Sequence, residues 1–173
     1  LPGARRVRSR PRLCLQPRAP SAQPGLPGEA ARVFTSRPQF SRPALDAEAF
    51  VGELLALAKA GGSSEAARIA ARTDDLFAPG TDVSRLSFTL RDRYTDLMWL
   101  GATRALWSLG DGSAAAPMFR RYGDAARTPL TKAKGYFWAG RAARQAGEQD
   151  NARRYFEEAA RWPDYYYGQL AHS

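Results

Sequence analysis

The sequence is poor in the residues from which most catalytic and metal centres are built. It has one cysteine, Cys14, and one histidine, His172, in 173 residues. A single thiol forms no internal disulfide, and neither residue has companions at metal-ligand spacing. His172 also lies next to the terminal Ser173, where a structured pocket for a nucleophile and its base is seldom formed. We therefore identify no catalytic, cofactor-binding or metal-ligating residue and expect no cofactor.

Long apolar runs are missing as well. No stretch approaches the roughly 18 apolar residues of a membrane span, so we expect none. The basic N-terminus is not followed by the continuous apolar segment that a secretory signal needs. No glycine-rich phosphate loop follows a strand pattern. The chain begins with Leu1 instead of Met, and we interpret it as a fragment or processed product.

Acidic residues are scarce in residues 1–43, which hold nine arginines, one glutamate and eight of the twelve prolines. This segment carries eight of the nine net positive charges, so residues 44–173 are nearly neutral. Its composition predicts a disordered arm, because it can bury little apolar surface. The arm is either a basic tether or a passive linker or non-native extension. No basic stripe follows a helix face, so we expect no nucleic-acid partner.

Helical patterns begin just after the arm. They predict two helices, over 47–59 and 63–76, and leave open whether 83–89 form a loop or a short helix. Polar caps and glycine or proline breaks mark the ends. The residues expected to begin or end these helices are Asp46, Ser63 or Ser64, Gly61-Gly62 and Pro79-Gly80.

The helical pattern is sharpest from Leu90. Apolar residues recur at the i, i+3, i+4 and i+7 spacing of one helix face. These residues are Tyr94, Leu97, Met98, Gly101, Ala105, Leu106 and Leu109. Trp99, Leu100 and Trp107 add apolar surface on other sides, so we expect this helix to be buried between neighbours.

A turn at Gly110-Asp111-Gly112 leads to a helix predicted over 113–122 and closed by Gly123. Pro117 is expected near the first turn of that helix, because a proline further inside costs about 3 kcal/mol.

A second helix pair is predicted over 131–146 and 150–162, with Asp150 as N-cap. Its expected apolar residues are Ala133, Tyr136, Phe137, Gly140, Ala143, Ala152, Tyr155, Phe156 and Ala159. A third unit opens at Asp164 and is cut off at Ser173.

The two pairs superimpose with an offset of 37 residues. The matched positions are Ala105 with Ala142, Leu109-Gly110-Asp111 with Ala146-Gly147-Glu148, Ala115 with Ala152, and Phe119 with Phe156. Helix–turn–helix units at this period predict an all-α helical-hairpin superhelix, similar to a tetratricopeptide solenoid. We therefore divide the chain into a disordered segment, 1–43, and a helical repeat scaffold, 44–173, truncated at its C-terminal end.

Two local clusters need a chemical interpretation. The carboxylate pairs Asp74-Asp75 and Glu157-Glu158 could do acid–base work only if one carboxyl were desolvated, and the second pair falls on the polar side of its helix. A solvated helix face is the better interpretation. The aromatic residues Trp162 and 165–167 could stack on sugars or bases, but packing between repeats is the simpler reading.

Two blocks of this sequence resemble a known family. The first runs from Leu90 to Gly101, LRDRYTDLMWLG. The second comprises Arg121-Tyr122-Gly123, Ala126-Arg127-Thr128-Pro129, Lys134 to Ala143 (KGYFWAGRAA), Tyr155-Phe156-Glu157 and Tyr166 to Ala171 (YYGQLA). Together they resemble the α-superhelical region of soluble lytic murein transglycosylases over about half of the chain, roughly 82–171. The arm, 1–43, shows no such resemblance.

The resemblance implies a specific activity for a longer protein. That family cleaves the bond between N-acetylmuramic acid and N-acetylglucosamine in peptidoglycan without water and leaves a 1,6-anhydro end. Its single catalytic glutamate belongs to a lysozyme-like domain with Glu-Ser and Gly-Leu-Met-Gln motifs, neither of which occurs here. No catalytic residue can be carried over to this chain. The family's helical region forms a ring or horseshoe that supports the catalytic domain.

The sequence therefore favours a fragment of a periplasmic lytic transglycosylase that supplies part of the helical scaffold. Its partner would be peptidoglycan glycan strands, reached through the missing catalytic domain. The alternative is a free-standing tetratricopeptide-type adaptor that binds a protein or peptide on a concave helical face.

Overall fold

We describe the protein from a computed structural model, which places residues 34–36 and 44–172. No strand occurs in these residues, so the all-α prediction is confirmed for them. The helices are α2 (Ala47–Ala60), α3 (Ser63–Arg72), α4 (Phe88–Thr103), α5 (Gly112–Ala125), α6 (Pro129–Gln145), α7 (Gln149–Ala160) and α8 (Tyr166–Ala171). Short 3₁₀ turns cover Thr73–Leu76 and Val83–Arg85, and a π-helical turn covers Arg104–Ser108. Among the described residues no helix has the length and apolar character needed to cross a membrane.

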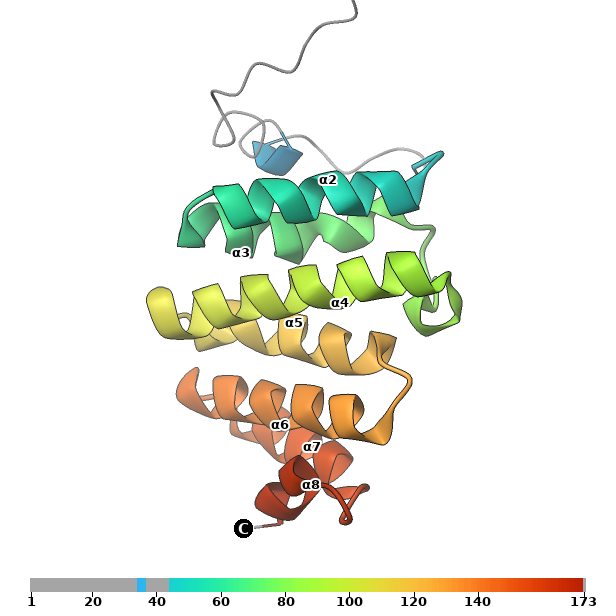
Figure 1. Cartoon of the computed structure of the whole chain (residues 1–173). Coiled ribbons are helices and arrows are strands. Elements are labelled where there is room, and N and C mark those ends of the chain that lie inside the picture. The colour runs from blue at the N-terminus through green and yellow to red at the C-terminus, as the bar shows by residue number, and fades with distance from the viewer. Residues whose placement is uncertain (1–33, 37–43, 173) are drawn as a thin grey trace, which may run out of the picture.

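The helices stack as pairs. Figure 1 shows three antiparallel pairs, α2 with α3, α4 with α5 and α6 with α7, and α8 follows at the far end. The first helices of the pairs, α2, α4 and α6, lie on one side of the stack, and α3, α5 and α7 lie behind them. Each pair packs on the next, so one continuous core runs through the stack.

The helix starts follow capping chemistry, with two corrections. Asp46 caps α2 as predicted, because its side chain accepts a hydrogen bond of 2.9 Å from the N–H of Ala49. The prediction that Ser63 or Ser64 caps α3 is wrong. Gly62 occupies the N-cap position, and no side chain accepts a hydrogen bond from the first turn. The N-cap of α7 is Glu148, and Asp150 lies in the first turn, where its charge still favours the helix N-terminus.

Helix α5 is longer than predicted, and two expectations about it are wrong. Asp111 caps the helix through the N–H of Ala114 at 2.8 Å, which starts it at Gly112. Pro117 then lies in the second turn, inside the helix, where it removes one backbone hydrogen bond. Gly123 does not end the helix, which continues to Ala125.

Gly123 has a packing role instead. It faces Gly135 of α6 where the two helices cross, and a Cβ added at Gly135 would lie 2.6 Å from the Gly123 nitrogen. The backbones of α5 and α6 therefore touch at this point, which a side chain at Gly135 would prevent. Gly140 acts similarly between α6 and α7, because a Cβ there would lie 2.8 Å from the Phe156 ring. At this position the absence of a side chain leaves room for an aromatic ring of the neighbouring helix.

The 37-residue correspondence is visible in the backbone. Gly110 and Gly147, which end the first helix of each pair, both have a positive φ, 67° and 80°. Ala105 and Ala142 are both fully buried, and Ala115 and Ala152 are buried too. The two pairs thus use the same turn and the same small core positions.

Most of the predicted disordered arm, 1–33 and 37–43, lies outside the described residues. Residues 34–36 do not fit the prediction, because they form a helical turn against the first helix pair. Phe34 is only 7% exposed and lies 6.3 Å from the Phe50 ring of α2. The Arg72 guanidinium donates a 2.8 Å hydrogen bond to the carbonyl of Thr35. A buried aromatic ring and a backbone hydrogen bond thus join this turn to the first helix pair.

Two tyrosine–aspartate joints connect successive pairs. The Tyr94 hydroxyl of α4 donates to Asp74, which follows α3, at 2.5 Å, and Arg121 pairs with the same carboxylate at 2.8 Å. The Tyr136 hydroxyl of α6 donates to Asp124 of α5 at 2.6 Å, and Arg120 pairs with that carboxylate. Each joint thus ties the end of one pair to the first helix of the next.

These joints predict a loss of stability at alkaline pH. Burial, together with the neighbouring aspartate, raises the pKa of Tyr94 and of Tyr136 well above the ordinary 10.0. The folded-state pKa is the raised one, so the stabilisation is complete below pH 10.0 and is lost as the pH rises above it. The free energy of unfolding should fall by up to about 1.4 kcal/mol per pH unit for each tyrosine. Urea unfolding at a series of pH values measures this slope.

The matched variant carries Tyr94→Phe and Tyr136→Phe together. It lacks both titrating hydroxyls and keeps the rings, so its stability should fall less steeply between about pH 10 and about pH 11. Equal slopes for the two proteins would contradict the role assigned to the joints.

Candidate functional site

Both predicted carboxylate pairs form ion pairs with arginine side chains. Asp74 and Asp75 point to different arginines, Asp74 to Arg121 and Asp75 to Arg72 at 3.1 Å. Glu157 is exposed, and Glu158 pairs with Arg161 at 3.0 Å, one turn along. Neither pair combines the desolvation and the convergence that acid–base catalysis needs.

Of the two remaining single candidates, the structure describes only His172. His172 is exposed, and its Nε2 lies 3.2 Å from the carbonyl oxygen of Ala160. Cys14 lies outside the described residues. Within the described part of the chain no group of three or more histidine, cysteine or carboxylate side chains could hold a metal ion.

The residues of the predicted aromatic cluster near the C-terminus have different surroundings. Trp162 stacks on Tyr136 with ring centroids 6.1 Å apart and an interplanar angle of 2°. Tyr167 packs against Phe137 at 5.5 Å, so these two residues fill gaps between α6 and α8. Tyr166 is the exposed member. Packing between helices is therefore the main role that the structure gives this cluster.

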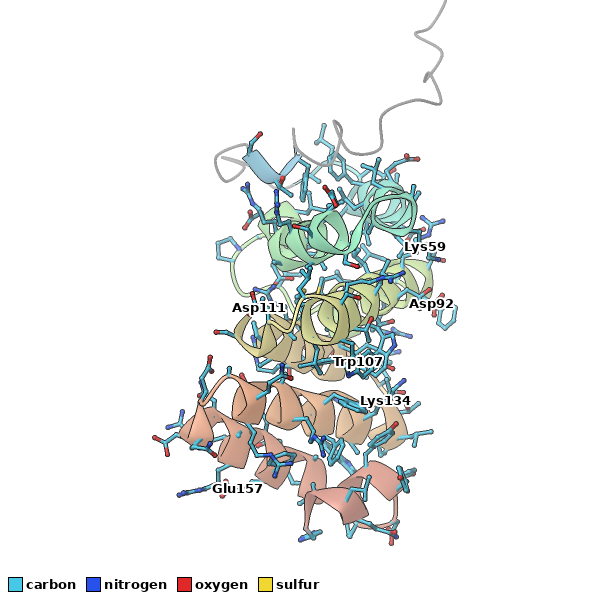
Figure 2. The ribbon with its side chains drawn as sticks, turned by 90° about the vertical axis from the view of Figure 1, so that its left-hand side faces the viewer. Lys59, Asp92, Trp107, Asp111, Lys134 and Glu157 are labelled. Carbon is cyan, nitrogen blue, oxygen red and sulfur yellow. The ribbon has the colours of Figure 1, made fainter. Side chains whose placement is uncertain are left out.

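A larger set of aromatic side chains lies on α4, α5 and α6. We define the aromatic face as Trp99, Trp107, Tyr122, Lys134 and Trp138. Figure 2 shows Trp107 and Lys134 on the same side of the stack, away from Glu157. Phe119 lies beneath, with its ring 5.3 Å from Trp99 and 6.2 Å from Trp138, and joins the two halves of the face.

Lys134 sits on the rings of this face. Its Nζ lies 3.6 Å from the centroid of Trp99 and 5.6 Å from that of Tyr122. Such a cation–π contact contributes about 0.5–1 kcal/mol at exposed sites. Burial lowers the pKa of Lys134 and raises that of Tyr122, where the charge of Asp96 acts in the same direction as burial.

Trp107 belongs to the π-helical turn that ends α4. Leu109 donates to the Arg104 carbonyl five residues back, at 3.1 Å, which widens the helix locally. Trp107 is 58% exposed and Leu109 is 47% exposed, so the predicted burial of both is wrong. The edge of Trp107 nevertheless meets the Trp138 ring at 5.2 Å and 87°. Such turns occur disproportionately at functional sites.

The chemistry of the aromatic face suits binding. Indole and phenol rings present flat apolar surfaces, and the neighbouring cations offer hydrogen-bond donors and positive charge. The face has no arrangement of a nucleophile with a base.

Comparison of the chain with protein-family models, with curated proteins and with solved structures gave no match.

Sequence reasoning missed most of the aromatic face. Trp99, Trp107 and Lys134 were each visible in the sequence, but the apolar periodicity assigned the two tryptophans to the core. The sequence did contain one indication of an exposed aromatic surface. The helix that begins near Leu90 has more aromatic residues than one buried face can hold. The π-helical turn had no sequence signal, because it is set by packing at the end of α4.

Proposed function

We propose that this chain forms part of the non-catalytic helical scaffold of a peptidoglycan lytic transglycosylase. In this proposal the bond cleavage takes place in a separate lysozyme-like domain of a longer periplasmic protein. The stacked helix pairs support the proposal, since each pair contacts its neighbours, as the units of a superhelix do. We propose that the stack continues as such a superhelix.

One observation carries the proposal. The sequence blocks that resemble the transglycosylase family hold the residues that set the spacing between helices. Tyr94 and Gly101 of the first block form the contacts of α4 with the preceding pair, where a Cβ on Gly101 would lie 2.2 Å from the Cβ of Ala70. Gly135, Gly140 and Gly168 of the second block do the same for α6, α7 and α8. The resemblance thus covers residues that determine how the scaffold packs.

The test uses purified peptidoglycan and the 173-residue chain. We expect no release of 1,6-anhydro products by this chain, because neither carboxylate pair in the described residues is arranged for acid–base work. We also expect the coding sequence that follows Ser173 to encode a lysozyme-like domain with a Glu-Ser motif. Joined to that domain, the chain should release anhydro products.

Clear turnover by the 173-residue chain would contradict the proposal. A coding sequence that stopped after a polar capping helix would favour the adaptor instead. The observation that favours this second function is the exposed Trp107 in the π-helical turn after α4, because exposed tryptophans are frequent anchor residues at protein interfaces. A peptide-binding screen with the same chain would then identify its ligand.

A further inference from the structure

A hollow of about 330 Å³ lies at one end of the aromatic face, between the π-helical turn and α6. Its lining combines two indole rings with two guanidinium groups and an amide. The lining residues are Leu106, Trp107, Trp138, Arg141, Arg144 and Gln145. The hollow therefore offers both an apolar ring surface and hydrogen-bond donors of positive charge.

The two indole rings form the wall of the hollow. Trp138 is held by ring contacts with Phe119 and Phe137, at 6.2 Å and 5.7 Å, so its position is set by the core. Trp107 meets it at a right angle and is more than half exposed. In addition, the Trp138 Nε1–H is buried without a hydrogen-bond partner in the described part of the chain. A buried donor without an acceptor is unfavourable, but this atom is closed to solvent, so the exposed ring of Trp107 is the surface that a ligand can reach.

The polar residues of the hollow leave donors available. Within residues 34–36 and 44–172 neither Arg141 nor Arg144 forms an ion pair. Arg144 lies over the Phe156 ring at 5.4 Å and also lines the two neighbouring hollows along α6 and α7. The Gln145 amide nitrogen donates to the carbonyl of Gly110 at 3.2 Å, which fixes the side chain and leaves its oxygen as an acceptor.

From this geometry we infer that the hollow is a binding site for a sugar ring that carries a carboxylate. The pyranose ring stacks on the exposed indole of Trp107, because the C–H groups of a sugar match an aromatic face. The carboxylate pairs with Arg141 or Arg144, whose forked N–H groups fit a carboxylate in bidentate fashion. Gln145 accepts a hydrogen bond from a sugar hydroxyl or amide.

The inference rests on the proposed function for its choice of probes. N-acetylmuramic acid and N-acetylglucosamine differ by one lactyl group, which bears the carboxylate, and so form a matched pair. Binding of each to the 173-residue chain is measured by tryptophan fluorescence and by calorimetry. We expect N-acetylmuramic acid to bind about tenfold more tightly than N-acetylglucosamine. The gain comes from one charge-assisted hydrogen bond between its carboxylate and an arginine at a solvent-exposed surface.

Three variants test the assigned roles. Trp107→Ala should weaken binding of both sugars about tenfold, because it removes the stacking surface. The double variant R141Q/R144Q should remove the preference for the acidic sugar, because no cation of the hollow then pairs with the carboxylate. Phe88→Ala is the control, since Phe88 is equally aromatic, lies on α4, is 71% exposed and lies outside the hollow. It should bind as the unaltered chain does.

Several outcomes would overturn the inference. These are equal affinity for the two sugars, unchanged binding in Trp107→Ala, and preference for an acidic peptide over the acidic sugar. The result can be separated from that of the proposed function. Release of anhydro products by the longer protein, with no sugar binding at the hollow, rejects the site alone. Sugar binding without any anhydro product rejects the transglycosylase assignment alone.

Discussion

Replacement of Phe119 by alanine is expected to lower the free energy of unfolding by about 3–5 kcal/mol. Phe119 is fully buried in α5, and its ring contacts Trp99 on one side and Trp138 on the other. The substitution removes a large apolar surface and leaves a cavity that the surrounding helices can close only in part. Urea unfolding followed by circular dichroism measures the change.

The same variant should alter tryptophan fluorescence before unfolding begins, because two of the four tryptophans lose a ring contact. Phe88→Ala is the matched control. The Phe88 side chain is 71% exposed, so its removal should change the free energy of unfolding by less than about 0.5 kcal/mol. A similar loss in both variants would mean that Phe119 does not occupy the centre of the core.

The second large effect is expected at Gly135. Gly135→Ala places a methyl group 2.6 Å from the Gly123 nitrogen and 2.7 Å from its Cα. These are backbone atoms, so relief requires α5 and α6 to move apart along their contact. We expect a loss of about 2–3 kcal/mol, which is the upper range for overpacking, and a fall of several degrees in Tm.

The control for Gly135 lies across the same helix crossing. Alanine at Gly123 meets its nearest neighbour, the Lys132 carbonyl oxygen, at 3.4 Å, which is close to ordinary contact. Because alanine favours the helix over glycine by about 0.5–1 kcal/mol, Gly123→Ala should be neutral or slightly stabilising. Thermal melts of the two variants should therefore move in different directions. Equal destabilisation would show that the close approach is not confined to Gly135.

The helices themselves could be predicted from the sequence because their signals are local. Asp46 has the side chain of an N-cap, and Gly110 and Gly147 mark helix ends that need a positive φ. These features depend only on residues within one or two turns. The pairing of helices followed from the repeated positions, since each pair alone would leave one face apolar.

The two errors about α5 have different origins, one distant and one local. Gly123 looks like a helix end, but it lies inside α5 because α6 approaches so closely at Gly135. Pro117 lies in the second turn for a local reason, because the cap supplied by Asp111 starts the helix at Gly112. Only for Gly123 does the deciding contact join two different helices.

The candidate site was the least predictable part. The helix that begins near Leu90 was expected to be buried on all sides, but Trp107, in the π-helical turn, is 58% exposed. Lys134 reaches the Trp99 ring from a different helix pair, so no spacing within one helix indicates their contact. Binding surfaces in stacked helices are assembled from several pairs, and their residues are dispersed in the sequence.

The tyrosine–aspartate joints have a mechanical consequence. Both lie near the connections between pairs, where the end of one pair meets the first helix of the next, whereas the Gly110 and Gly147 turns lie at the opposite edge. The hydrogen bonds of the two joints are partly buried, whereas those that cross the other edge, from Ser113 to Glu148 and from Gln145 to Gly110, are exposed to water. Because water competes with exposed hydrogen bonds, the second edge should yield first when the stack is pulled or bent.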